Sequence, residues 1–293
     1  MLSSTEIKQA ALAVGFDDCG IARADALTDE EYPLREWLRR GWHGDLDYMA
    51  RNADKRMDPR LLVPGAKSVI CCVSAYPPPD DILPASGGNP GNPGNRFDKI
   101  SQDFAKREKV AAYAKYRDYH KDIKQMLFAL RERLGIEGKC CCDTVPISDK
   151  HWAARAGLGW IGRHTLLVTP RWGSWVNLGE IVTTEECSEY SDRTNNSSPK
   201  LGDEHKLQWS FADGRRGVSS FCSNCGRCVA ACPNHAIAPD GPPMLNVTRC
   251  TAYYTTHHQR ELPADIDTRG YTQGCDLCQL ACPFNRRPLG LDG

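Results

Sequence analysis

The stretch CSNCGRCVAACPNHAI, residues 222–237, decides the fold of the C-terminal part of this 293-residue chain. Its four cysteines have the spacing C-x2-C-x2-C-x3-C-P, which is the pattern of bacterial ferredoxins. In that pattern three thiolates bind one [4Fe–4S] cluster and the fourth crosses to a second cluster. A second run, GCDLCQLACPFN at 274–285, repeats the end of the pattern with three cysteines. Two clusters are therefore expected.

Two such clusters need eight thiolates, and the two runs supply seven. Cys250 is the only cysteine between the runs, and we predict it as the eighth ligand. Paired CxxC motifs also bind zinc, but eight cysteines, two CP endings and no histidine at ligand spacing favour clusters. The crossing rule gives a first set, Cys222, Cys225, Cys228 and Cys282, and a second set, Cys232, Cys250, Cys275 and Cys278.

The chain has 15 cysteines, and the other seven are interpreted as structural. A cytoplasmic protein does not use disulfides on this scale, since its compartment keeps thiols reduced. We expect small buried side chains in the apolar run around residues 71–72, and consecutive cysteines cannot wrap one cluster. The seven are Cys19, Cys71, Cys72, Cys140, Cys141, Cys142 and Cys187.

Charge and the N-terminal sequence limit the class of protein. The chain has 37 basic and 37 acidic residues, so no overall field indicates a nucleic-acid partner, although a local basic face is compatible with zero net charge. Residues 1–27 carry acids early and lack a long apolar run, which predicts an amphipathic helix and a short strand rather than a signal peptide or membrane span. We predict a cytoplasmic protein without a membrane segment.

The pattern along the chain predicts an α+β (mixed α/β) fold in two domains, 1–185 and 186–293. Residues 68–75 form a continuous apolar run and are predicted as a buried strand. Apolar residues recur at helical spacing over 101–134, with Gly135 as the C-cap, so Tyr113 and His120 are expected on one face of that helix. A short helix and then two strands joined around 170–174 are expected next.

The sequence GLGWIG at 157–162 has the spacing G-x-G-x-x-G but precedes a predicted strand instead of opening a helix. Without that context the motif is weak. We therefore reject a Rossmann nucleotide site.

Four motifs, together with the cluster segment, resemble the epoxyqueuosine reductase family, cobalamin-dependent iron–sulfur enzymes of tRNA modification. The resemblance extends from about residue 5 to about residue 287. The most specific motif is the third. In order they are KRMDPRLLVPGAKSVI (55–70), YAKYRDYH (113–120), DTVPISDKHWAARAGLGWIGRHTLL (143–167) and GSWVNLGEI (173–181).

The resemblance implies a cobalamin held between the larger domain and the clusters. The clusters would deliver single electrons to reach cob(I)alamin, and the reaction would remove the epoxide oxygen of epoxyqueuosine at the tRNA wobble position. The implied partners are a tRNA anticodon stem-loop and a low-potential donor such as a flavodoxin or ferredoxin. We expect a monomer.

Breaking an epoxide C–O bond leaves an alkoxide, so a proton donor must lie near the leaving oxygen. The family motif has an acid at the position of Asp143, which we predict as the general acid, kept protonated by burial near the cofactor. The competing interpretation is a turn aspartate before Pro146. Asp149 is the second candidate.

The expected cofactor contacts are less specific. Arg56 and Arg60 could hold cobalamin amides or tRNA phosphate, or be solvated loop residues. Base stacking in tRNA recognition would use Trp172, Trp175, Arg286 or Arg287. The residues predicted to contact cobalamin are Arg56, Tyr113, His120, Asp143, Arg163, His164, Thr165 and Ser174.

Two other functions remain open at this point. A corrinoid reductase of another substrate, such as an organohalide, would share the cofactors, although that family usually begins with a twin-arginine export signal. A ferredoxin-like electron-transfer protein would need no substrate site, and the motif around Asp143 argues against it.

Overall fold

The computed structural model describes residues 2–79, 109–116, 118–191, 222, 224–257 and 261–286. No helix within these ranges is both long and apolar enough to cross a lipid bilayer. The part of the expected helix at 101–108, and Arg287, lie outside the described residues.

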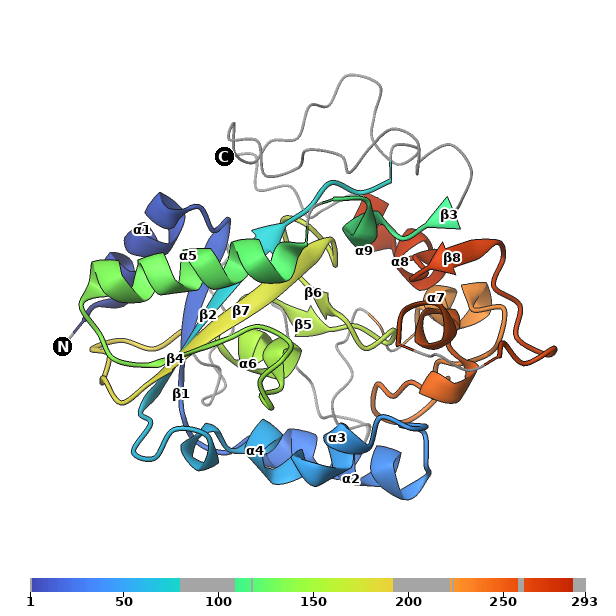
Figure 1. Ribbon diagram of the computed structural model, residues 1–293, viewed down its shortest axis with the longest axis horizontal. Coiled ribbons are helices and arrows are strands. Elements are labelled where there is room, and N and C mark those ends of the chain that lie inside the picture. Colours follow the sequence, from blue (N-terminus) through green and yellow to red (C-terminus); the bar gives the residue numbers. More distant parts are fainter. Residues whose placement is uncertain are drawn as a thin grey trace.

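A four-stranded antiparallel sheet forms the centre of the molecule (Figure 1). Its order is β1 (Asp18–Arg23), β2 (Ser68–Ala75), β7 (Val176–Thr183) and β4 (Lys139–Cys141). In the register of β2, Cys72 lies opposite Cys19 on one side and Gly179 on the other. The predicted strand at 68–75 is confirmed.

Helices cover both faces of this sheet, which explains why β2 reads as a continuous apolar run. On one face α1 (Ser4–Val14) and α5 (Tyr119–Leu134) pack against Ile70 and Cys72. On the other face α6 (Asp149–Arg155) packs against Val69, Cys71 and Val73. The mixed α/β prediction is confirmed, with a sheet made of antiparallel strands.

The helix predicted over 101–134 was wrong at its N-terminal end. Its C-terminus is as expected, with Gly135 in the left-handed region at φ 61°. Its start is Tyr119, because the Asp118 side chain accepts a hydrogen bond from the His120 N–H and caps the helix there. Tyr113 belongs to a separate short 3-10 helix, so it does not share a helical face with His120.

Short elements carry the rest of the described chain. The glycine motif at 157–162 leads into strand β5, not into a helix, so the rejection of a nucleotide site agrees with the local structure. The remaining elements are α2 (Thr28–Arg39), α3 (Asp47–Arg51), α4 (Ala53–Met57), η1 (Pro59–Leu61), β3 (Lys109–Val110), η3 (Ala112–Lys115), β5 (Trp160–Ile161), β6 (Leu167–Val168), α7 (Arg227–Ala231), η4 (Val247–Arg249), η5 (Tyr253–His257), β8 (Tyr271–Gln273), α8 (Leu277–Leu280) and α9 (Pro283–Arg286).

The cysteine-bearing segment packs against one end of the sheet domain, with α7, α8 and α9 grouped together (Figure 1). Strand β8 pairs in parallel with β3 from the first half of the chain. Helix α2 and the loop after it also reach this segment, since Trp37 Nε1 of α2 donates to the Leu245 carbonyl at 2.6 Å and the Tyr253 hydroxyl bonds to Asp45 of the loop. The division at residue 185 stays a prediction, and these pairings cross it.

Candidate iron–sulfur and catalytic site

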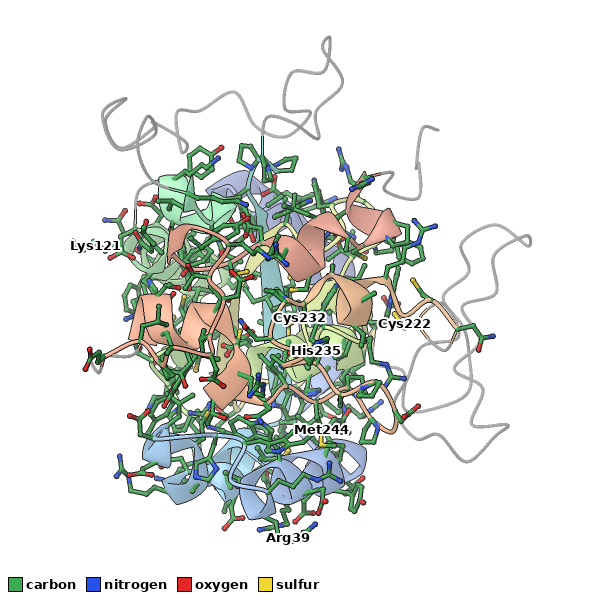
Figure 2. The ribbon with its side chains drawn as sticks, turned by 90° about the vertical axis from the view of Figure 1, so that its right-hand side faces the viewer. Arg39, Lys121, Cys222, Cys232, His235 and Met244 are labelled. Carbon is green, nitrogen blue, oxygen red and sulfur yellow. The ribbon has the colours of Figure 1, made fainter. Side chains whose placement is uncertain are left out.

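The first set of cysteines surrounds one pocket. Its lining includes all four predicted ligands together with Arg163, His164 and the start of α7 and α9. Cys225 is exposed at the rim, whereas Cys228 and Cys282 are buried. Figure 2 shows Cys222 on the same face of the molecule as Cys232 of the second set. The structure thus brings together the four residues that the crossing rule assigns to one cluster.

The second set converges as well. Cys232 follows α7, Cys250 follows η4, and Cys275 and Cys278 flank the start of α8. Burial raises the pKa of Cys278 well above its usual value, and the charges of the other three members raise it further. The charge of Cys228, from the first set, raises it as well, so the two sets lie close to each other, and Cys250 as the eighth ligand stays a prediction.

The sulfur atoms are placed as acceptors of backbone N–H groups, which is the environment that cluster thiolates need. The N–H of Ala236 lies 3.3 Å from Cys232 Sγ. Burial raises the pKa of Cys282 to about 11, but the N–H groups of Phe284 and Asn285 oppose that shift. Within the described ranges no three His, Cys, Asp or Glu side chains are grouped tightly enough for a single metal ion. The thiols instead line a pocket, which fits a cluster of several atoms.

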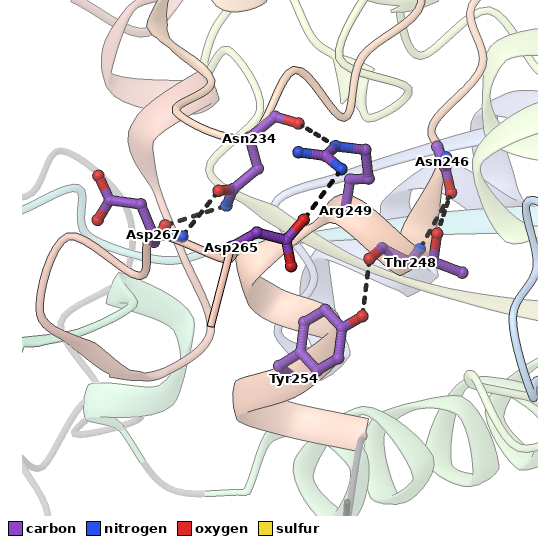
Figure 3. Close-up of polar contacts among 7 residues, drawn as sticks. All are labelled: Asn234, Asn246, Thr248, Arg249, Tyr254, Asp265 and Asp267. Carbon is purple, nitrogen blue, oxygen red and sulfur yellow. Dashed lines mark hydrogen bonds and ion pairs between the residues drawn. The ribbon is translucent and has the colours of Figure 1, made fainter. Parts of the chain in front are cut away.

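A polar network holds the loops on either side of the second set (Figure 3). Asn234, two residues after Cys232, donates from Nδ2 to the Asp267 carbonyl at 3.0 Å and accepts from the Asp267 N–H at 2.8 Å. Arg249, directly before Cys250, donates from Nε to the Asn234 carbonyl at 2.8 Å. The network therefore fixes Cys232 and Cys250 relative to each other.

A buried joint connects the cysteine segment to the sheet domain at Ser174. The N–H of Ser174 donates to Asn285 Oδ1 at 2.6 Å, and its hydroxyl oxygen accepts from Asn285 Nδ2 at 2.8 Å and Gln279 Nε2 at 3.1 Å. Gly173 is required beside it, because a Cβ at that position would collide with Asn285. Ser174 was predicted as a cofactor contact, but its hydroxyl oxygen is an acceptor of hydrogen bonds within this joint.

Asp143 follows β4 in the chain and lies beside the N-terminal end of α5. Two side chains from that end hold its carboxyl group. The Tyr119 hydroxyl donates to Asp143 Oδ2 at 2.6 Å, and His120 Nε2 lies 3.1 Å from the same oxygen. The backbone of Asp143 is in the left-handed region at φ 51°, a conformation that costs energy and that clusters at functional sites. Its side chain is 47% exposed in the protein alone, and its burial against the cofactor stays a prediction.

Behind Asp143 lies a pair of carboxyl groups in the core. Glu180 of β7 is fully buried and faces α6, and its carboxyl group contacts that of Asp149. Burial raises the pKa of Asp149, at the start of α6, to about 6. Burial and the charge of Asp149 raise the pKa of Glu180 well above its usual value.

Arg56 adds a cation to this region. It is 8% exposed, its charge lowers the pKa of Asp149, and one of its terminal nitrogens donates to the Ile147 carbonyl at 3.3 Å. Its Nε has no partner within the part of the chain that the structure describes. Arg60, by contrast, is half-exposed and forms an ion pair with Asp58 at 2.8 Å. Of the two arginines, only Arg56 offers a buried free donor.

The turn between β5 and β6 carries three predicted contacts. Arg163 donates to the Gly241 carbonyl at 2.7 Å, and Thr165 has φ 69°, which is unfavourable for a β-branched residue. His164 Nδ1 accepts from the Leu166 N–H at 3.2 Å, so its proton is on Nε2. Burial lowers the pKa of His164 to about 4, and its buried Nε2 has no partner among the residues described here.

Tyr113 links the second cysteine set to the Asp143 region. Its ring lies against Gly274, next to Cys275, and meets the Tyr119 ring edge-on at 6.3 Å between centroids. Its hydroxyl lies 3.4 Å from Thr256 Oγ1. Two aromatic rings therefore separate the cysteine segment from the Asp143 carboxyl.

The residues expected to stack on tRNA bases differ in exposure. Trp175 is 3% exposed and points its Nε1 to the Asn285 carbonyl, so it is not accessible to a base. Trp172 packs partly on the core with the Arg171 guanidinium over its ring. Arg286 lies at the surface and donates to the Leu280 carbonyl.

The sequence interpretation missed Tyr119 and Glu180. A lone acid inside the apolar strand sequence VNLGEIVT was a usable signal for Glu180, since a buried carboxylate is costly unless it is paired or neutral. Tyr119 stood between two residues of a quoted motif, but only its hydrogen bond to Asp143 shows its importance.

The fold and the two converging cysteine sets define an iron–sulfur oxidoreductase with an acidic site beside the clusters. Models of known families match both the sheet domain and the cysteine segment. A model described as a 4Fe-4S double cluster binding domain matches residues 221–285, and one described as epoxyqueuosine reductase QueG, DUF1730, matches residues 56–149.

The chain is 33% identical over 287 residues to an epoxyqueuosine reductase of Cyclobacterium marinum, covering 96% of this chain and 78% of that protein. This chain belongs to the epoxyqueuosine reductase family. A crystal structure of an epoxyqueuosine reductase with an epoxyqueuosine-modified tRNA-Tyr stem loop superposes with TM-score 0.68 at 25% identity, over 97% of this chain and 65% of that one. The reductive dehalogenase NpRdhA shares the fold alone, with TM-score 0.52 at 15% identity over 96% of this chain and 32% of that one.

Proposed function

We propose that this chain reduces epoxyqueuosine to queuosine in a tRNA anticodon stem-loop, with two [4Fe–4S] clusters and cobalamin as cofactors. The observation that carries the proposal is the Asp143 carboxyl, held by Tyr119 and His120 two aromatic rings away from the second cysteine set. Family membership supports the reaction, and the tRNA stem loop bound to a related enzyme supports the substrate.

The described residues fit the cofactors. Eight thiols in two sets suit two clusters, and backbone N–H groups are directed at their sulfur atoms. A corrin ring carries amide side chains, whose carbonyl oxygens need donors. Two buried donors that have no partner among the described residues, Arg56 Nε and His164 Nε2, are suitable for that role. When bound, cobalamin would supply a strongly reducing cobalt centre.

The proposed cobalamin contacts are those predicted from the sequence. They differ in whether their polar groups already have partners in the protein. Arg56 and His164 have free donors, and Thr165 has the strained backbone often found at ligand sites. Tyr113 and His120 border the Asp143 carboxyl. Arg163 and Ser174 already have protein partners and would act by holding their loops.

Asp143 would act as the general acid on the epoxide oxygen. The reaction removes that oxygen as water, so two electrons and two protons enter for each alkene formed. A carboxylic acid near the leaving oxygen prevents the formation of a free alkoxide. A substrate that covers the half-exposed Asp143 would exclude water from the carboxyl group and the leaving oxygen.

The test begins with anaerobically purified protein, measured for iron, sulfide and corrinoid. It is then assayed under strong reductant with an epoxyqueuosine-containing stem-loop, with nucleosides measured by mass spectrometry. We expect queuosine from the wild type and a loss of roughly 10²–10⁴-fold in Asp143→Asn with unchanged cofactor content. Asp265→Asn, a change at a 69% exposed carboxylate, is the control and should keep full activity.

Other results would contradict the proposal. Clusters and corrinoid without queuosine would favour a corrinoid reductase of another substrate, the function of the dehalogenase with which the chain shares its fold. Clusters without corrinoid binding would favour a ferredoxin-like electron carrier. The donor, proposed as a flavodoxin or ferredoxin, would be identified by replacing the chemical reductant with each protein. A monomeric state in the cytoplasm is part of the same proposal.

A further inference from the structure

The proposed reaction consumes two protons, one more than the Asp143 carboxyl group can hold. Opening the first C–O bond of the epoxide produces an alkoxide, which takes one proton and becomes a hydroxyl group. Breaking the second C–O bond releases that hydroxyl group as water and takes another proton, while two electrons arrive from the clusters. One carboxyl group holds one proton, so Asp143 must be protonated again within each turnover.

The side chain next to Asp143 can supply that proton. His120 lies between two carboxylates, with Nδ1 at 2.8 Å from Asp118 Oδ1 and Nε2 at 3.1 Å from Asp143 Oδ2. The His120 backbone N–H also bonds to Asp118 Oδ1, and this hydrogen-bonded contact with His120 lowers the pKa of Asp118. Asp118 is therefore an ionised acceptor, and His120 Nδ1 carries a proton.

This assignment has a consequence at the other ring nitrogen. If Nδ1 is protonated and the imidazole is neutral, Nε2 is an acceptor without a proton. Two acceptors at 3.1 Å would repel each other, so either Asp143 is protonated or His120 is an imidazolium. In both states one proton lies between His120 Nε2 and Asp143 Oδ2.

Tyr119 holds the pair in place but does not supply the proton. Its hydroxyl donates to Asp143 Oδ2, and its ring stacks on the His120 ring at 4.1 Å between centroids. Burial and the nearby Asp143 carboxylate raise the pKa of Tyr119 far above its usual value, so it keeps its proton at neutral pH. The imidazole, which is 37% exposed, can be recharged from solvent.

We infer that His120 reprotonates Asp143 during turnover and that Asp118 sets the tautomer that makes this transfer possible. The inference rests on the proposed function. His120 acts through Asp143: the second proton of each turnover passes from solvent to His120, to Asp143 and to the leaving oxygen.

The test separates proton supply from positioning. A glutamine at position 120 can still donate an N–H to Asp143 but cannot transfer a proton. We expect kcat of His120→Gln and His120→Ala to fall about 10²-fold with KM within about twofold, and imidazole in the buffer to restore at least about 10-fold in His120→Ala. Lys121→Ala changes the next residue of the helix, which is exposed at the edge of the molecule (Figure 2), and should show neither loss nor rescue.

The outcomes distinguish the two proposals. Full kcat in His120→Gln, or a loss in His120→Ala that imidazole does not reverse, would overturn the role of His120 while leaving the reaction intact. Any inhibition by imidazole as such would appear in Lys121→Ala and is corrected for there. Absence of queuosine from the wild type would overturn the proposed function and this role with it. Cluster content, measured in each variant, identifies any protein that has not folded.

Discussion

Replacing Asp149 by asparagine should stabilise this protein above neutral pH. Asp149 is held next to the buried Glu180, and burial raises its pKa from 3.8 to about 6. An acid whose pKa is raised by folding destabilises the native state whenever it is ionised. The cost is absent below the unfolded pKa, grows as pH rises from 3.8 to about 6, and is complete above that.

The size of the effect follows from the shift. About two pKa units correspond to about 3 kcal/mol, since one unit is about 1.4 kcal/mol. At about 2.1 cal/mol/K per residue, this chain has an unfolding entropy near 0.6 kcal/mol/K, so the gain raises Tm by about 5 °C at pH 8. At pH 5 roughly half of that gain remains. The asparagine amide can donate to Glu180 in place of the contact between the two carboxyl groups, which keeps the pair hydrogen-bonded.

Differential scanning calorimetry of the anaerobic holoprotein at pH 5 and pH 8 measures this. The quantity to compare is the difference between variant and wild type, because burial also lowers the pKa values of His151 and His164, to about 3 and about 4, and their titration affects both proteins. Asp265→Asn, at an exposed carboxylate, should leave Tm unchanged. A variant no more stable than wild type at pH 8, or a gain that does not grow with pH, would refute the argument.

Three further changes test the other parts of the site. Tyr119→Phe removes a donor to the general acid and should lower kcat about 10–100-fold with full cluster content, whereas Tyr32→Phe, at a 61% exposed ring, should not. Cys250→Ser should reduce iron from about eight to about four atoms per chain, and Cys140→Ser should not; equal iron in both would remove Cys250 from the ligand set. Asn285→Ala leaves buried partners unsatisfied and should cost about 2–4 kcal/mol, seen as a Tm lower by roughly 3–7 °C; an unchanged Tm would show that the joint is not needed.

The cysteine sets could be predicted from spacing because cluster geometry constrains short segments of chain directly. The sequence distance between Cys222 and Cys228 already brings their thiols to one cluster, and the proline after each run ends the loop. Cys250 could be predicted by counting the ligands that two clusters need. The buried strand β2 could also be predicted from local sequence, since eight apolar or small residues in a row predict a strand covered on both faces.

The remaining features depend on distant parts of the chain. Residues 109–110 form a strand because β8, about 160 positions later, pairs with them, and no local pattern reveals that partner. The exposure of Asp143 depends on which residues pack over its loop, and the motif does not contain them. The carboxyl pair of Asp149 and Glu180 forms because β7 enters the sheet beside β2, a pairing set by the tertiary fold.

The pairing of β3 with β8 also determines when this protein can mature. At a synthesis rate of about 5–20 residues per second, the edge at residue 110 waits roughly 10–30 s until residue 271 has been made. The second cysteine set is complete only when Cys278 has been made, 46 residues after Cys232. Until then the cysteines made earlier have no complete cluster site, and their thiols can be oxidised or can bind another metal. The second cluster can therefore be inserted only after β8 and the second cysteine run have been made, so that cluster assembly and the pairing of β3 with β8 depend on the same late segment.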